Sequence, residues 1–156
     1  MDTVFASLVA VAGTLIGSFS TYAFQRRTTA RTEALAKAER LRQERLTAYS
    51  SYAAAVTELK RGMITLWFRR RHTPPDEERL VTALLESDRL GAAADTAAFR
   101  LQLVADDPHL RPLMTAISQK LGEITHAADR AALVTIERAF EDRVRAFVDA
   151  AGERLR

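Results

Sequence analysis

The chain has 156 residues, of which 47% are hydrophobic and 28% are charged. This length suits one compact domain with a short appendage, and the composition excludes both a disordered chain and a multi-pass membrane protein. The absence of cysteine excludes disulfides, thiol catalysis and cysteine-bound metals, while six glycines and four prolines are too few for a fold with many tight turns. Stretches rich in Ala, Leu, Arg and Glu favour helices, so we predict an all-α fold.

The first predicted element is a transmembrane helix at residues 4–24. No charged residue occurs in residues 3–25, and 21 helical residues span roughly 30 Å of hydrocarbon. Serines, threonines and two glycines make this a marginal span. A cleaved signal peptide is the alternative, which we disfavour because no Lys or Arg precedes the apolar run and the cleavage-like site is poor.

Basic residues directly after this segment predict its orientation. Arg26, Arg27 and Arg31 follow it, and basic residues beside a span stay on the cytoplasmic side. We therefore expect the chain in the cell membrane, with an extracytoplasmic tail at residues 1–3 and a cytoplasmic C-terminus. Together with Lys37, these arginines are expected to contact the anionic headgroups of the bilayer, at about 1 kcal/mol each.

One face of the predicted span carries small side chains at spacings of four and three residues. They are Ala6, Ala10, Gly13, Gly17 and Thr21. Association in lipid depends on close packing, so this face, with its GxxxG pair, predicts a homo-oligomer. The alternative is that small residues simply occur on every face of an Ala-rich segment.

The cytoplasmic part is predicted to begin as a continuation of the same helix. Residues 25–45 form a basic juxtamembrane arm, because neither Gly nor Pro occurs between Gly17 and Gly62. Residues 46–156 are predicted to form an up-and-down bundle of three to four antiparallel helices. The first of these has an apolar seam typical of a coiled coil or bundle, made of Tyr49, Tyr52, Val56, Leu59, Met63 and Leu66.

A proline-containing turn at residues 72–78 separates the first two bundle helices. Thr73 is expected to cap a helix whose first position is Pro74, with three acids in its first turn, and which runs to about Val104. The predicted core face of this helix comprises Leu80, Leu84, Ala94, Ala98, Leu101 and Ala105.

A second proline-containing turn precedes the last part of the bundle. Asp106 or Asp107 is expected to cap a helix that starts at Pro108. Residues 108–152 then form either one bent helix or two helices with Asp129 as the second cap. The two apolar sets that leave this choice open are Leu110, Leu113, Ile117, Leu121, Ile124 and Ala128, followed out of phase by Leu133, Ile136, Phe140, Val144, Phe147 and Ala151.

Charge is distributed unevenly along the chain. Lys and Arg minus Asp and Glu sum to −1 in residues 1–25, to +8 in residues 26–71 (12 basic, 4 acidic) and to −4 in residues 72–156 (11 basic, 15 acidic). Part of this asymmetry is expected to be complementarity between helices within the chain.

A basic cluster with an aromatic residue ends the first bundle helix. Its members Trp67, Arg69, Arg70 and Arg71 are candidates for contact with a partner or a nucleic acid, with the indole stacking on a base. We favour the alternative that these arginines stabilise the negative end of the helix dipole at the C-terminus. One such cluster does not make the charged, aromatic-lined groove that binding of a nucleic-acid strand needs.

The sequence contains no set of residues that predicts catalysis. Glu123 and His126 form a Glu-x-x-His, but di-iron bundles need two such motifs and further glutamates. No Gly-rich phosphate loop and no combination of nucleophile, base and orienting group is recognisable. We therefore predict no metal, no cofactor and no enzymatic activity.

Three stretches of the sequence carry a family resemblance. They are Gly13-Thr14-Leu15-Ile16-Gly17-Ser18 with Thr21-Tyr22-Ala23-Phe24-Gln25-Arg26-Arg27, then Leu41-Arg42-Gln43-Glu44-Arg45-Leu46-Thr47-Ala48-Tyr49-Ser50, and Phe99-Arg100-Leu101-Gln102-Leu103-Val104 before Asp106-Asp107-Pro108. In this order they resemble the KilB-type plasmid-spread (intramycelial transfer) membrane proteins of actinomycete conjugative plasmids. The resemblance implies a small membrane-associated protein that helps a plasmid spread through the mycelium and is harmful when overproduced. It implies no particular functional residues.

Together these observations predict a non-enzymatic single-pass membrane protein that acts in conjugative plasmid spread by associating with itself and with other plasmid-transfer proteins. The alternative is a membrane-tethered adaptor or regulator whose bundle binds a soluble partner or nucleic acid.

Overall fold

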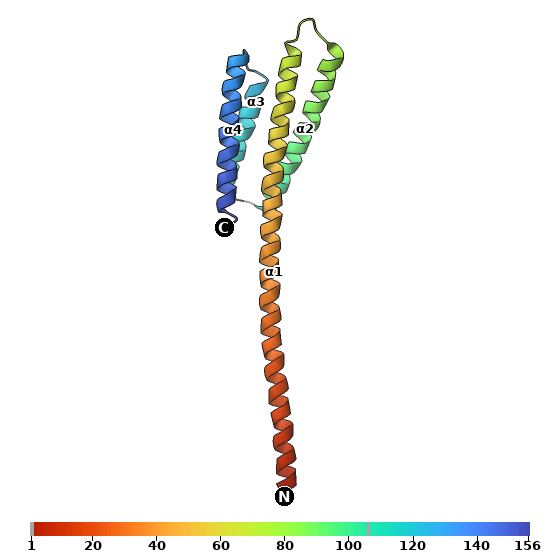
Figure 1. Ribbon diagram of the computed structural model, residues 1–156, viewed down its shortest axis with the longest axis vertical. Helices are drawn as coiled ribbons and strands as arrows, with labels where there is room; N and C mark the ends of the chain where they lie inside the picture. The colour runs from red at the N-terminus through yellow and green to blue at the C-terminus, as the bar shows by residue number, and fades with distance from the viewer. Residues whose placement is uncertain (1, 106) are drawn as a thin grey trace. The chain divides into compact units, whose positions relative to one another are not determined.

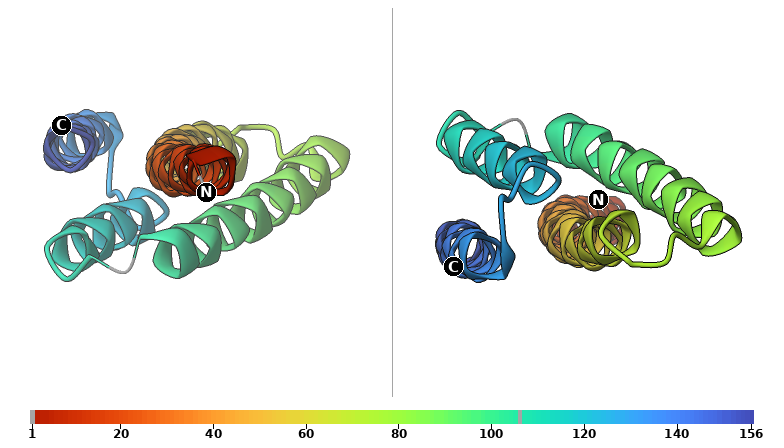
Figure 2. Two further views of the ribbon diagram at one scale, coloured as in Figure 1. Left: turned by 90° about the horizontal axis from the view of Figure 1, so that it is seen from below. Right: turned by 90° about the horizontal axis from the view of Figure 1, so that it is seen from above.

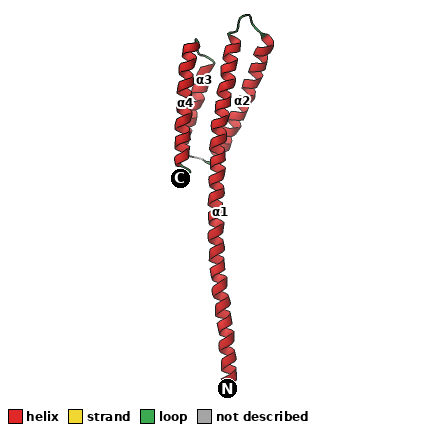
Figure 3. Ribbon diagram, viewed as in Figure 1, coloured by secondary structure: helices red, strands yellow, loops and turns green. Residues whose placement is uncertain are grey.

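The computed structural model describes the backbone of residues 2–105 and 107–156, and side chains from residue 31 onward within those ranges. In this part of the chain all regular structure is helical, as Figures 1 and 3 show. The four helices are α1 (Asp2–Arg70), α2 (Glu77–Val104), α3 (Leu110–Ile124) and α4 (Arg130–Glu153). The all-α prediction is therefore confirmed.

The chain divides into two compact units, Met1–Arg42 and Gln43–Arg156. The first unit is the N-terminal part of α1, whose side chains are exposed from residue 31 to residue 42. Among the side chains that are described, no helical stretch is both long and apolar enough to cross a membrane. The segment predicted to do so, residues 4–24, lies outside them.

In the second unit, consecutive helices run in opposite directions, as Figure 1 shows. Figure 2 shows the same helices viewed from either end. The indole N–H of Trp67, near the end of α1, donates a hydrogen bond to the carbonyl oxygen of Ala127 in the turn between α3 and α4. Tyr49, five turns earlier in α1, contacts Phe147 near the end of α4. The connections between helices are short, and short connections require this antiparallel arrangement.

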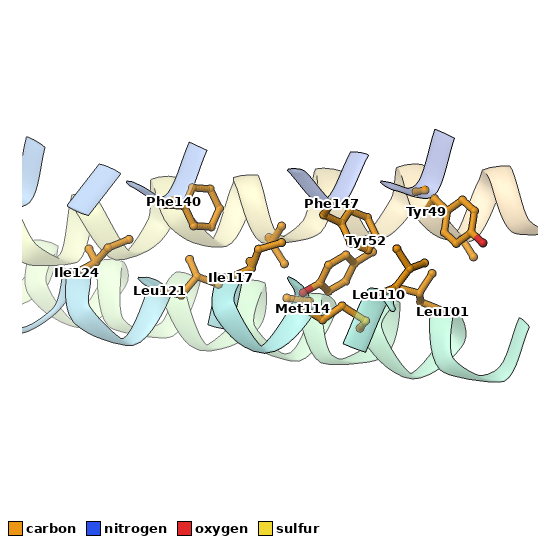
Figure 4. Close-up of a cluster of buried hydrophobic side chains, with 14 of the residues drawn as sticks. Tyr49, Tyr52, Leu101, Leu110, Met114, Ile117, Leu121, Ile124, Phe140 and Phe147 are labelled. Carbon is orange, nitrogen blue, oxygen red and sulfur yellow. The ribbon is translucent and has the colours of Figure 1, made fainter. Parts of the chain in front are cut away.

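The core lies between the four helices and contains most residues of the predicted apolar seams, although Leu84 and Ala128 are exposed. Figure 4 shows it near Tyr52 and Phe147, whose ring centroids are 5.0 Å apart in an edge-to-face arrangement. Two members of the α1 seam, Leu59 and Met63, are only half-buried. The largest fully buried side chains are Phe140, Phe147, Leu101, Leu110, Ile117, Ile124 and Leu133. Burial of one such side chain stabilises a fold by about 1.5–3 kcal/mol, so these residues dominate the stability of the bundle.

The start of α2 differs from the prediction. The capping residue is Asp76, whose Oδ1 accepts a hydrogen bond of 3.1 Å from the backbone N–H of Arg79. The prediction of Thr73 as the cap and Pro74 as the first helical residue was wrong. Because a residue before proline is disfavoured in the helical conformation, Pro75 keeps Pro74 out of the helix, and Asp76 is the first residue beyond the prolines that can cap it.

Residues 108–152, for which the sequence allowed one bent helix or two helices, form two separate helices, α3 and α4. A turn follows Ile124, and the carboxylate of Asp129 accepts a hydrogen bond of 2.8 Å from the backbone N–H of Ala132. Asp129 is thus the cap predicted for the two-helix alternative. The change of phase between the two apolar sets therefore reflects a break in the chain direction.

The start of α3 also differs from the prediction, because the helix begins at Leu110 rather than at Pro108. The carboxylate of Asp107 accepts a hydrogen bond of 2.8 Å from the backbone N–H of His109, and the Asp107 carbonyl accepts one of 3.1 Å from Leu110. These bonds form a turn that delays the helix by two residues. Asp106 lies outside the described residues.

Candidate interaction surfaces

The basic cluster at the end of α1 is partly built into the bundle. Trp67 is 4% exposed, and its indole Nε1–H donates a hydrogen bond of 2.9 Å to the carbonyl oxygen of Ala127. Nη2 of Arg71 donates to the same oxygen at 2.6 Å, and Cζ of Arg71 lies 4.1 Å from the centroid of the Trp67 ring. With its ring buried in this way, Trp67 does not offer a face for stacking on a base.

The other two arginines of the cluster lie in different surroundings. Arg70 is exposed, whereas Arg69 is half-buried. Arg69 lines a surface pocket of about 560 Å³ between α1 and α2, together with the acidic residues Asp76, Glu78 and Glu86. Arg79 lines the same pocket and lies 3.1 Å from Asp76, so the pocket carries charges of both signs and is not a basic groove. The cluster therefore presents fewer available cations than the sequence suggests.

The residues predicted to act at the membrane are mostly outside the described side chains. Arg31 and Lys37 are exposed on α1. The remaining residues of both predicted sets, Ala6, Ala10, Gly13, Gly17, Thr21, Arg26 and Arg27, lie outside. Their roles in packing and in headgroup contact stay predictions.

Asp107 links the start of α3 to the end of α4. Its Oδ2 accepts a hydrogen bond of 2.6 Å from Nε of Arg154. The hydrogen bond from the His109 backbone N–H lowers the pKa of the Asp107 carboxyl most, and the bond from Arg154 lowers it further. The pKa of Tyr49, in the same pocket, is raised because its hydroxyl is partly desolvated by burial. These contacts fasten one end of the bundle.

Lys60 is a nearly buried cation that joins α1 to α4. The residue is 8% exposed, and its Nζ donates a hydrogen bond of 2.9 Å to Oε1 of Glu141. Nζ also lies 5.5 Å from the centroid of the Phe140 ring. The aliphatic stem packs against the core while the ammonium group reaches Glu141 at the surface. The hydrogen bond from Lys60 is the main cause of the lowered pKa of Glu141.

The Glu-x-x-His motif is on the surface. His126 and Glu123 are exposed, and the Glu123 carboxylate accepts hydrogen bonds of 2.7 and 2.8 Å from Nζ of Lys120. Within the part of the chain that the structure describes, no three His, Asp or Glu side chains lie close enough to hold a metal ion.

The structure shows a second, largely apolar face on α2 that was not predicted from the sequence. We call it the α2 stripe, and it comprises Val81, Leu85, Asp88, Ala92, Thr96, Phe99 and Leu103. Its large apolar members are 51%, 63%, 63% and 88% exposed, for Val81, Leu85, Phe99 and Leu103 respectively. In contrast, the buried residues of α2 are Ala83, Ser87, Ala94 and Leu101.

The α2 stripe lies opposite the core face of α2. Each buried residue of α2 follows a stripe residue by two positions, and two positions correspond to roughly 200° around a helix. The predicted core face included Leu84, which is 40% exposed and flanks the stripe. The signal in the sequence was a second apolar period along α2, but only one apolar face was assigned to this helix.

Comparison with known proteins supports the resemblance seen in the sequence. The family model of the KilB plasmid transfer protein matches residues 46–155. No curated protein and no solved structure matches the chain. The matched region comprises nearly all of the four-helix unit and most of the chain. The chain therefore belongs to the KilB plasmid transfer protein family.

Proposed function

We propose that this protein acts in conjugative plasmid spread as a single-pass membrane protein without enzymatic activity, through association with itself and with other plasmid-transfer proteins. The observation that carries the biological setting is the family match across residues 46–155. The match supports a role in plasmid transfer, and the sequence features of residues 4–37 support the membrane setting.

The anchor is proposed to be residues 4–24, with the N-terminus outside and the bundle in the cytoplasm. Support comes from the uncharged run of residues 3–25 and from Arg26, Arg27 and Arg31 after it. The backbone of this segment is part of α1 and is helical. A helix satisfies its own backbone hydrogen bonds, as a membrane-spanning segment must.

Membrane fractionation of the full chain tests the anchor. We expect the protein in the membrane fraction, resistant to extraction by high salt, with its N-terminus intact by mass spectrometry. Leu15→Arg places a charge near the middle of the segment, at a cost of roughly 2.5–3.5 kcal/mol, and should release protein that Leu15→Ile leaves in the membrane. Recovery of the intact native chain in the soluble fraction at low salt would contradict the proposal.

Self-association in the membrane is proposed to involve the small-residue face of the anchor. Gly13→Ile with Gly17→Ile should weaken the signal of a membrane self-association reporter, because bulky side chains prevent close approach of two helices. Ala12→Ile is the matched control, since it makes a similar change on another face. An unchanged signal in the double variant would remove this face from the proposal.

A plasmid-spread assay tests the function and the anchor together. Deletion of residues 1–31 should abolish both spread and the harm caused by overproduction if the protein works by assembling in the membrane. A truncated chain that still binds a soluble partner and still supports spread would instead favour the membrane-tethered adaptor.

A further inference from the structure

We draw no further inference here: the strongest candidate, the α2 stripe with its exposed Val81, Leu85, Phe99 and Leu103, carries none because nothing in the part of the chain that the structure describes shows what covers this face.

Discussion

Trp67 and Arg71, one turn apart at the end of α1, both donate a hydrogen bond to the carbonyl oxygen of Ala127, at 2.9 and 2.6 Å. The guanidinium group of Arg71 also stacks on the indole ring, 4.1 Å from its centroid. Ala127 lies in the turn after α3, where a helix end leaves carbonyl groups without partners. Trp67, in the last turn of α1, and Arg71, directly after α1, thus hold the turn between α3 and α4.

This shared acceptor predicts that Trp67 and Arg71 are energetically coupled. Trp67→Phe and Arg71→Ala should each lower the free energy of unfolding by about 1 kcal/mol or more. The double variant should lose more than the sum, because the buried Ala127 carbonyl then has no side-chain donor. Urea unfolding followed by circular dichroism measures the cycle, with Arg70→Ala as the near-neutral control. Additive losses would contradict the coupling.

The Phe147 ring is predicted to be the most sensitive core position. It is fully buried and meets Tyr49 and Tyr52 edge-to-face. Phe147→Ala should lower the free energy of unfolding by roughly 3–5 kcal/mol. The neighbouring Val148, 48% exposed, should tolerate replacement by Ala within about 0.5 kcal/mol. A similar loss at the two positions would show that α4 packs differently.

The cap of α4 is predicted to contribute to stability through one hydrogen bond. Asp129→Ala removes the acceptor of the Ala132 N–H and should lower the unfolding free energy by about 0.5–2 kcal/mol. Asp129→Asn should retain most of the stability, because an amide oxygen also caps. Asp142→Ala is the control, since this exposed carboxylate lies 3.9 Å from Arg145 and such pairs contribute little.

Alkaline pH should destabilise the bundle through Tyr52. Burial raises the pKa of its hydroxyl to about 12, against a smaller lowering by the hydrogen bond with Ser118. The unfolded chain releases this proton near pH 10, so the contribution is complete below pH 10 and is lost as the pH rises toward 12. Tyr52→Phe should flatten that part of the stability profile, by up to roughly 2–3 kcal/mol. Parallel profiles for the two proteins would contradict the assignment.

The repeat of apolar residues predicted the core well, because a helix that faces a core must bury one side. Tyr52, Ile117 and Phe140 all lie where their three- and four-residue spacings place them. The phase change before Leu133 was compatible with one bent helix or with two, and the structure has two, α3 and α4. Helix starts were less predictable, since several candidate caps stood next to each other and proline geometry decided between Thr73 and Asp76.

The candidate surfaces were harder to predict than the core. A cluster such as Trp67 with its arginines has the same sequence pattern whether it binds a partner or packs within the bundle. Only the position of the Ala127 carbonyl in the structure distinguishes these two roles. The α2 stripe was missed because both faces of α2 carry apolar residues. Which face of α2 packs into the core depends on the space that the side chains of the other three helices leave for it.

By itself, the sequence determined the helical class, most of the core seams and the family resemblance, and it named Asp129 as the cap for one of two alternatives. Each of these depends on residues close together in the chain, or on a period that one helix imposes. Only the tertiary structure decided that Trp67 and Arg71 share the Ala127 carbonyl, that Lys60 reaches Glu141, and that Leu85 and Phe99 lie outside. The contacts join residues 56 to 81 positions apart, and the exposure of Leu85 and Phe99 depends on competition between two faces of α2 for one core. A local pattern encodes neither.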